Sequence, residues 1–341
     1  MRITKESLLR IARENVSQRI HARPDLVAAY LTGSLLQDEP LLGNTTDIDL
    51  VFVHPFQPSI RREIVPLSAE IHLDIKYNPR SEYENPRELR THPWLGPELY
   101  APMRLFDASH FFDFVQAGVR DKYYEPDNSH RRGSLNAQHA RNIWSDLPNL
   151  PADSPHTLLT YLKSVNHAAN AIAVIQNSPL SERRFLRQFQ SIASPAGFGS
   201  MAGDLVGILG GDQIDKDVLV AGLPDWAEDF SKAGRLPSSD VRLHPARLLY
   251  YQRGFETLLQ SEQPLSVLWG YLHTWCLAAD LLTGKDLANW TSFMNQLGMI
   301  GPGFERRCGQ LDAFLDKVEN VLDNLATLNG INDMDENNIS R

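Results

Sequence analysis

Two aspartates separated by one residue, Asp47 and Asp49, stand at the head of the apolar segment Leu50-Val-Phe-Val53. On a strand, residues i and i+2 point to the same face, so these carboxylates are expected side by side while Ile48 faces the opposite way. Adjacent like charges repel unless a cation lies between them. Because Mg²⁺ prefers oxygen ligands and often combines carboxylates with substrate phosphates, the pair indicates a site for a metal–nucleotide complex.

Acid-x-acid pairs are common by chance, so the surrounding segment must distinguish this one. Asp215-Lys-Asp217 is interpreted as part of a Gly-rich polar loop, and Asp333-Met-Asp335 lies near the C-terminus. Neither pair is followed by an apolar strand. The position of Asp47 and Asp49 before a buried strand therefore favours chemistry there.

Two further features support such a site. Residues 70–77 alternate strictly between polar and apolar, which places His72 and Asp74 on one face of a strand. A third carboxylate from a neighbouring strand would complete a two-metal cluster. Gly33-Ser34 follows an apolar strand, and a glycine there allows backbone N–H groups to approach a phosphate.

The order of an apolar strand, Gly33-Ser34, Asp47-x-Asp49 and a later lone acid, Asp74, resembles the DNA-polymerase-β-like nucleotidyltransferase superfamily. The helical second half is similar in layout to the aminoglycoside (kanamycin-type) nucleotidyltransferases, and the motif-bearing likeness covers residues 26–76. The resemblance implies that the three aspartates are catalytic and hold two Mg²⁺ ions. It also implies phosphate contacts from Gly33 and Ser34 and a nucleotide contact from Thr46, which stands where the family has a serine before the first aspartate.

The activity implied by the resemblance is Mg²⁺-dependent transfer of a nucleoside monophosphate, AMP from ATP in the commonest case, to a hydroxyl group with release of pyrophosphate. The expected partners are a nucleotide and a small-molecule acceptor; an aminoglycoside-like cation would suit acidic walls. Asp74 is expected to keep an unshared oxygen that could accept the hydroxyl proton. A protein hydroxyl is the other acceptor that the sequence leaves open.

The second half of the chain offers further candidates. Related enzymes use a basic helix residue near the triphosphate, which makes Lys163 a candidate, although a solvated lysine is the simpler interpretation. Arg183-Arg184 could likewise meet phosphate or solvent. The aromatic residues Trp269, Tyr271 and Trp275 are expected in a helical core, with an acceptor pocket as the alternative.

Three other functions compete with this hypothesis. A kinase-like loop is suggested by His72-Leu-Asp74, but Asn78 falls one residue early and no Gly-rich phosphate loop precedes it. A catalytically silent relative could bind nucleotide or a partner protein. A protein- or RNA-directed nucleotidyltransferase could use the same fold, but 33 basic against 42 acidic residues give a net charge of −9, which argues against nucleic acid.

The periodicity of the chain predicts a small sheet, which carries these residues, followed by many helices. Leu8, Ile11, Ala12 and Val16 repeat at helical spacing. Strands are predicted over 26–32, 48–53, 69–77 and 103–106, and helices over 108–124, 133–147, 155–177, 181–193, 200–210, 244–261, 264–283, 287–297 and 303–328. The predicted fold is therefore α+β, with a small mixed-sheet nucleotidyltransferase domain at 1–107, a larger all-helical domain at 108–330 and a disordered tail at 331–341.

The cysteine content and the distribution of apolar residues predict the cellular compartment of the protein. Only Cys276 and Cys308 occur, without a CxxC neighbour, so a disulfide framework and a cysteine-based zinc site are not expected. The N-terminus lacks the apolar core of a signal peptide, and no apolar run is long enough to cross a membrane. We therefore expect a cytoplasmic protein without membrane contact, whose helical half could supply a homodimer face.

Overall fold

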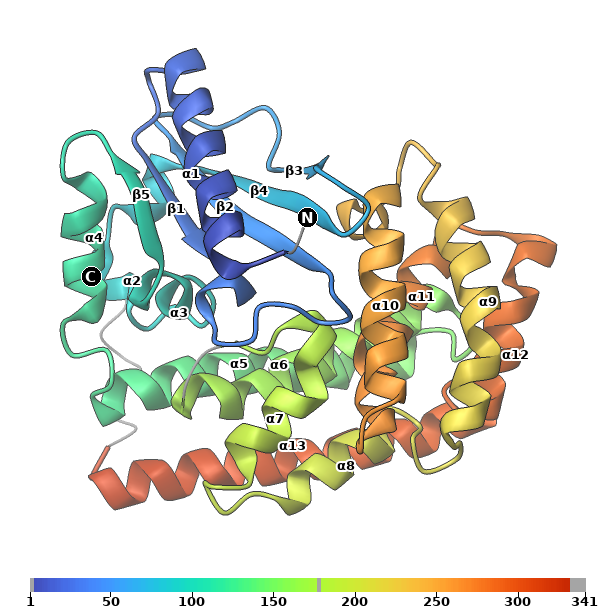
Figure 1. The fold of residues 1–341 in the computed structure, drawn as a ribbon. Coiled ribbons are helices and arrows are strands. Elements are labelled where there is room, and N and C mark those ends of the chain that lie inside the picture. The colour runs from blue at the N-terminus through green and yellow to red at the C-terminus, as the bar shows by residue number, and fades with distance from the viewer. Residues whose placement is uncertain (1–2, 177–178, 332–341) are drawn as a thin grey trace.

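A mixed five-stranded sheet forms the first part of the chain in the computed structural model, which describes residues 3–176 and 179–331 (Figure 1). The strand order is β3-β4-β2-β1-β5, in which β2 and β4 run parallel and the other neighbours antiparallel. The strands are β1 (Ala28–Thr32), β2 (Thr46–His54), β3 (Arg62–Pro66), β4 (Ile71–Pro79) and β5 (Met103–Asp107). A larger helical part follows, so the predicted α+β fold class is confirmed.

Helices cover both faces of the sheet. α1 (Lys5–Ala22) packs Leu8, Ala12 and Val16 against a face that includes Ile48 and Leu50. The opposite face, which carries Val51 and Val53, packs against α2 (Pro86–Leu89), α3 (Leu95–Tyr100) and α4 (Phe111–Arg120). The hydrophobic cover of the sheet therefore continues beyond residue 107 through α4. Strand alternation then places Asp47 and Asp49 on the face opposite α1, and the prediction that they share a face turned away from Ile48 is confirmed.

Nine α-helices complete the described chain beyond residue 125. They are α5 (Pro126–Asp146), α6 (Pro155–Gln176), α7 (Phe185–Ala193), α8 (Ser200–Ile208), α9 (Lys216–Ala233), α10 (Leu248–Leu259), α11 (Leu268–Ala279), α12 (Ala288–Gln296) and α13 (Pro302–Asn329). Short 3-10 helices are η1 (Ser34–Leu36), η2 (Arg80–Tyr83), η3 (Leu147–Asn149), η4 (Glu182–Arg184), η5 (Val241–Leu243), η6 (Pro245–Arg247), η7 (Pro264–Val267) and η8 (Gly284–Leu287). In Figure 1, α5, α6 and α13 run beneath the sheet while α9 to α12 stand beside it.

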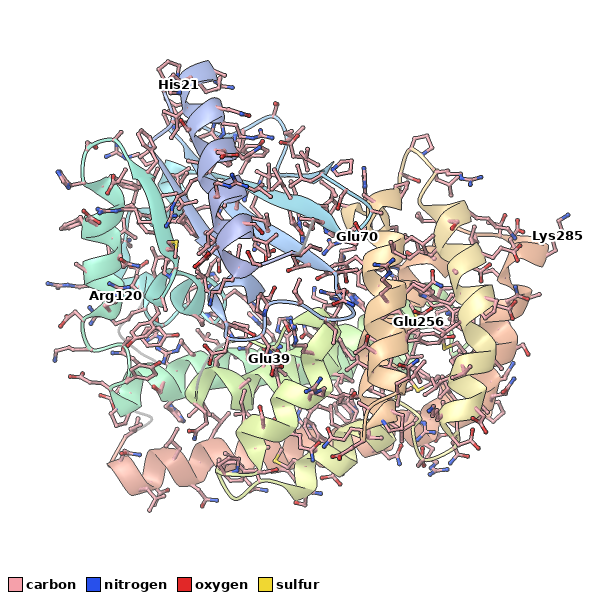
Figure 2. All side chains as sticks on the ribbon, in the orientation of Figure 1. His21, Glu39, Glu70, Arg120, Glu256 and Lys285 are labelled. Carbon is pink, nitrogen blue, oxygen red and sulfur yellow. The ribbon has the colours of Figure 1, made fainter. Side chains whose placement is uncertain are left out.

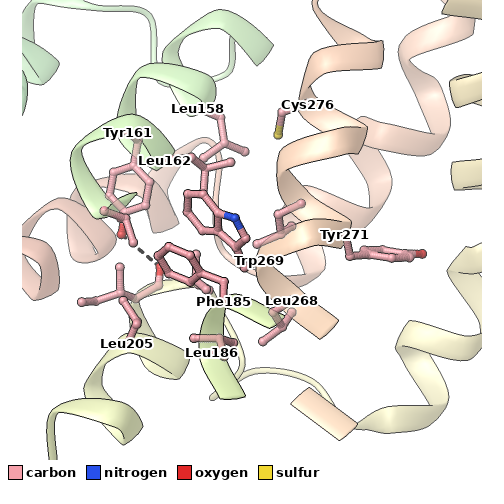
Figure 3. Packing of buried hydrophobic residues seen from close by; sticks show 14 of the residues in the cluster. Leu158, Tyr161, Leu162, Phe185, Leu186, Leu205, Leu268, Trp269, Tyr271 and Cys276 are labelled. Carbon is pink, nitrogen blue, oxygen red and sulfur yellow. Dashed lines mark hydrogen bonds between the residues drawn. The ribbon is translucent and has the colours of Figure 1, made fainter. Parts of the chain in front are cut away.

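Aromatic side chains fill the core of this helical part (Figure 3). Phe185 stacks on Trp269 with 4.1 Å between ring centroids. Tyr271 and Trp275 are buried in the same cluster, where Trp275 donates a hydrogen bond to Asp229. The predicted core role of Trp269, Tyr271 and Trp275 is confirmed.

The short helices α2 and α3 were not predicted, and two further elements, β3 and α9, were also missed. β3 is a five-residue edge strand with only one fully buried side chain, Ile64, so it carries no clear alternation. α9 contains Pro224, which lacks the N–H of a helix interior and breaks a helical pattern. The interpretation of Asp215 to Asp217 as a polar loop is wrong, because the Asp215 carboxylate caps α9 by accepting from the amides of Asp217 and Val218.

Two further expectations concern the C-terminal tail and membrane-spanning segments. The predicted tail at 331–341 lies outside the described residues except for Ile331. None of the described helices combines the length and apolarity that crossing a bilayer requires.

Replacing the α9 cap should cost stability. Asp215→Ala leaves two first-turn amides without their acceptor, and we expect a loss of about 1 kcal/mol in the free energy of unfolding. Asp215→Asn is the matched control, because asparagine caps as well as aspartate. Urea unfolding of both variants measures the difference, and equal losses would contradict the capping role.

The stability of the helical half should fall at acid pH through His167. Its Nδ1 lies 3.2 Å from Asn136 Oδ1, and burial lowers the pKa of its imidazole to about 4. Because the unfolded chain binds this proton near pH 6.5, stability is present above that pH and is lost as pH falls toward 4. His167→Gln should flatten this loss, whereas replacing the exposed His21 (Figure 2) should leave it unchanged; urea unfolding at stepped pH compares them.

Candidate metal and nucleotide site

Parallel pairing of β2 with β4 brings three carboxylates together. Asp49 lies directly opposite Asp74 in the register, and Asp47 precedes it on the same face. One oxygen from each of the three aspartates lies within 4.8 Å of the others. Asp47 and Asp74 are 6% and 1% exposed, so water screens their mutual repulsion poorly. The predicted convergence of the three side chains is present.

Asp49 is the member of the triad without a counter-charge in contact. Among the described residues, none donates a hydrogen bond to its carboxylate or forms an ion pair with it. Burial, followed by the charges of Asp47 and Asp74, raises the pKa of Asp49 well above its usual value. A divalent cation at this carboxylate would relieve the same repulsion that otherwise favours its protonation.

Asp47 is held by two side chains from the helical part. Tyr250 Oη donates to Asp47 Oδ2 at 2.8 Å, and Arg247 Nη2 lies 3.4 Å from the same oxygen. Burial alone would raise the pKa of Asp47, but the positive charges of Arg247 and Arg183 outweigh it and lower that pKa. Asp47 is therefore ionised in the folded protein.

Asp74 is locked by an arginine on the neighbouring edge strand. Arg62 donates from Nε to Oδ1 at 2.6 Å and from Nη2 to Oδ2 at 2.5 Å. Arg247 Nη1 lies a further 3.3 Å from Oδ2. The expectation that Asp74 keeps an unshared oxygen for a hydroxyl proton is wrong, since both of its oxygens already accept from Arg62.

Gly33 allows the turn after β1 to pass against the triad. Its φ of 76° is unfavourable for a residue with a side chain, and a Cβ built there would lie 1.9 Å from Asp49 Oδ2. Gly33 therefore sets the position of the Asp49 carboxylate. The Ser34 hydroxyl lies beside it, 3.5 Å from the carbonyl oxygen of Pro40.

Thr46 has a structural contact rather than one to the open site. It is fully buried, and its hydroxyl donates to the carbonyl of Pro40 at 3.2 Å. The bond ties the connection between η1 and β2 to the start of β2. The position implied for a phosphate contact by resemblance is thus occupied by a side chain that faces the protein interior.

The triad opens onto a cavity of about 710 Å³ between the sheet and the helical part. The basic side chains of its lining, called the basic wall below, are Arg62, Lys76, Arg183, Arg184 and Arg247. The mainly aromatic and apolar side chains of the lining, called the aromatic wall below, are Trp94, Pro97, Tyr100, Ala101, Tyr123, Tyr124, Pro179 and Leu180. Its tyrosines contact one another: Tyr100 stacks on Tyr123 at 4.4 Å and meets Tyr124 edge-on at 5.0 Å.

The structure does not bring Lys163 to this cavity. α6 turns Tyr161, Leu162, Ser164 and Val165 into the core, so the intervening lysine is exposed on the outer side of the helix. Lys163 is not among the residues that line the cavity. Lys163 therefore lies on a face of α6 that does not line the cavity, and a short sequence motif cannot determine which face of a helix a residue occupies.

The arginine pair that the sequence left open does reach the site. Arg183 is 4% exposed, lies over the Tyr250 ring and donates from Nη1 to Thr45 Oγ1 at 2.8 Å. Arg184 Nη2 donates to the carbonyls of Glu39 and Leu41, in the segment where Figure 2 labels Glu39. Both side chains therefore fasten the connection before β2 to the helical part, and both line the cavity.

Sequence reasoning missed Arg62, Arg247 and Tyr250 as site residues. A hairpin prediction over β3 and β4 could have found Arg62, because it precedes Asp74 by only 12 residues. Arg247 and Tyr250 stand 200 and 203 residues from Asp47, and no local pattern links them to it.

Two comparisons with known proteins give no match. No protein-family model matches this chain, and a search of curated proteins finds no match. The site is therefore interpreted from its own residues.

Replacing Gly33 should disrupt the triad. Gly33→Ala places a methyl group on the Asp49 carboxylate, and we expect at least about a tenfold loss of Mn²⁺ affinity together with backbone strain of about 1–3 kcal/mol. Gly197→Ala is the matched control, since Gly197 has a φ of 86° but open space around its Cα. Calorimetric Mn²⁺ titration compares them, and equal affinities in the two variants would refute the role assigned to Gly33.

Proposed function

We propose that this protein is a divalent-cation-dependent nucleotidyltransferase that moves a nucleoside monophosphate, AMP from ATP in the commonest case, to a hydroxyl of a small molecule. The observation that carries the proposal is the triad of Asp47, Asp49 and Asp74 at the edge of a cavity that also holds a basic wall. The order of Gly33-Ser34, the aspartate pair and the later aspartate supports it through its resemblance to the polymerase-β-like superfamily. We further propose that the protein acts in the cytoplasm, because its two cysteines are free thiols.

The residues of the triad fit a hard divalent cation. They offer three carboxylate oxygens at mutual distances under 4.8 Å, and no residue that the structure describes forms an ion pair with Asp49. When bound, Mg²⁺ supplies charge neutralisation at the phosphates of the nucleotide. Asp47 and Asp49 would hold it.

In the proposed reaction, the acceptor hydroxyl oxygen attacks the α-phosphorus of the nucleotide. A new O–P bond forms, and the bond from that phosphorus to the bridging oxygen of the β-phosphate breaks. Pyrophosphate leaves with the electron pair, and the hydroxyl proton passes to water or to a carboxylate of the triad. Positioning and charge neutralisation supply most of the catalysis in such a transfer, and the buried guanidinium of Arg247 lies where it can contribute.

The aromatic wall favours an acceptor with an uncharged ring over a polycation. Glu98 in this region already accepts from Tyr30 Oη at 2.8 Å and pairs with Lys76 Nζ at 3.0 Å. Glu182 is likewise bonded to Tyr251 and His273. The acids expected to attract an aminoglycoside-like compound are therefore already engaged by contacts within the protein, and Trp94 and Tyr124 offer stacking surfaces instead.

One observation favours a second candidate, a nucleotide-binding relative without transferase activity. Arg62 and Arg247 contact two of the three carboxylates, so the triad is partly neutralised without a metal ion. Binding of ATP without release of pyrophosphate would select this second function.

Incubation with each labelled NTP, Mg²⁺ and a panel of ring-bearing hydroxyl compounds tests the first function. We expect pyrophosphate release with an adenylated product, reduced at least about a hundredfold in Asp49→Asn, because the substitution removes the carboxylate best placed to bind the cation. Asp323→Asn, which alters an exposed acid on α13, should retain full turnover. Equal turnover in the two variants, or no product with any acceptor, would count against the transferase.

A further inference from the structure

The charges of the triad and of the side chains in contact with it do not cancel. With all three carboxylates ionised, as cation binding requires, they contribute −3, and the guanidiniums of Arg62 and Arg247 contribute +2, which leaves −1. Lys76 adds nothing to this sum, since its ammonium pairs with Glu98. Arg183 adds further positive potential on the Asp47 side. One divalent cation would bring this sum to +1 and two would bring it to +3, so a single cation leaves the smaller excess of charge.

We propose that this site binds one divalent cation, held by Asp47 and Asp49, and that Arg62 with Asp74 takes the place of the second cation expected from the resemblance. The number of cations bound at the site is inferred from the contacts of these residues alone. Only the nucleotide that the cation would accompany rests on the proposed function. Arg62 is a positioning residue, because it touches Asp74 and not the reacting atoms.

The bond geometry separates Asp74 from the other two acids. Arg62 approaches both Asp74 oxygens as a fork, at 2.6 and 2.5 Å, and Asp74 is 1% exposed. A cation at Asp74 would have to displace this guanidinium and leave a buried contact broken. The pairing of β3 with β4, in which Arg62 lies opposite Lys76, keeps the arginine beside Asp74.

Asp47 and Asp49 keep ligand atoms available. Tyr250 and Arg247 both contact Asp47 Oδ2, and no described residue donates a hydrogen bond to Asp47 Oδ1. Asp49 has no such donor to either oxygen among the described residues. The free oxygens therefore lie on β2, two residues apart on one face, where a single cation can bridge them.

Arg247 completes the arrangement from the helical part. Its Nη1 lies 3.3 Å from Asp74 Oδ2 but without hydrogen-bond alignment, and its Nε also has no partner among the described residues. Arg247 is 3% exposed and lines the cavity. Its loosely held N–H groups can turn toward the phosphates of a bound nucleotide, whereas those of Arg62 are committed to Asp74.

Mn²⁺ is the probe that tests this proposal, without nucleotide and on the full chain. Electron paramagnetic resonance counts the bound ions during a titration into the millimolar range. We expect one ion per wild-type chain and none in Asp49→Asn. No bound ion in the wild type, or two ions of similar affinity, would overturn the proposal even if every variant failed to fold.

Variants of Arg62 test its part in the count. Arg62→Met removes the charge and should allow a second Mn²⁺ to bind, while Arg62→Lys keeps a cation there and should bind one. Arg61→Met is the matched control, because the neighbouring Arg61 pairs with Glu82 instead. A folded Arg62→Met variant, checked by circular dichroism, that still binds one ion would refute the substitution of arginine for metal.

The outcome is independent of turnover. One Mn²⁺ per chain with no pyrophosphate release would leave the cation count standing and reject the transferase. Two ions per chain with rapid pyrophosphate release would do the reverse.

Discussion

Three aspartates lie together in a poorly solvated corner of the sheet, and their mutual repulsion governs which side chains surround them. Parallel pairing of β2 and β4 places Asp49 against Asp74, and strand alternation adds Asp47. In a low effective dielectric, such charges cannot remain together without counter-charges. The protein supplies these from two directions, Arg62 from the edge strand and Arg247 from the helical part, and leaves Asp49 for a ligand.

The same electrostatic need joins the two parts of the molecule. Tyr250 and Arg247 reach from the helical part to Asp47, while Arg183 and Arg184 fasten the connection before β2. A close approach at Gly43, where a Cβ would lie 2.3 Å from the carbonyl oxygen of Arg253, holds that connection against α10. The side chains that line the proposed binding site therefore also hold the two parts of the molecule together.

The cavity is lined by both charged and aromatic side chains. Several of its charges are already paired within the protein, such as Lys76 with Glu98 and Arg62 with Asp74. A bound molecule therefore gains most where compensation is incomplete, at Asp49 and Arg247, and where rings can stack, at Trp94 and the tyrosine group. The proposed ligands, a nucleotide with a divalent cation and a neutral ring-bearing acceptor, would together meet both demands.

Local periodicity was enough to predict the mixed fold class, the helix at the N-terminus, the faces of β2 and β4 and the core role of Trp269, Tyr271 and Trp275, because each follows from side-chain direction along one element. The convergence of Asp74 with Asp47 and Asp49 was also predictable, from alternation on two strands combined with a family resemblance. The tertiary structure alone decided which cations meet these acids: Arg247 lies 200 residues from Asp47, Arg62 depends on an edge strand without clear alternation, and Lys163 falls on the outer face of α6. Charge compensation is a long-range property of the packed chain. A pattern of residue types along the sequence carries no information about which distant guanidinium will lie beside which carboxylate.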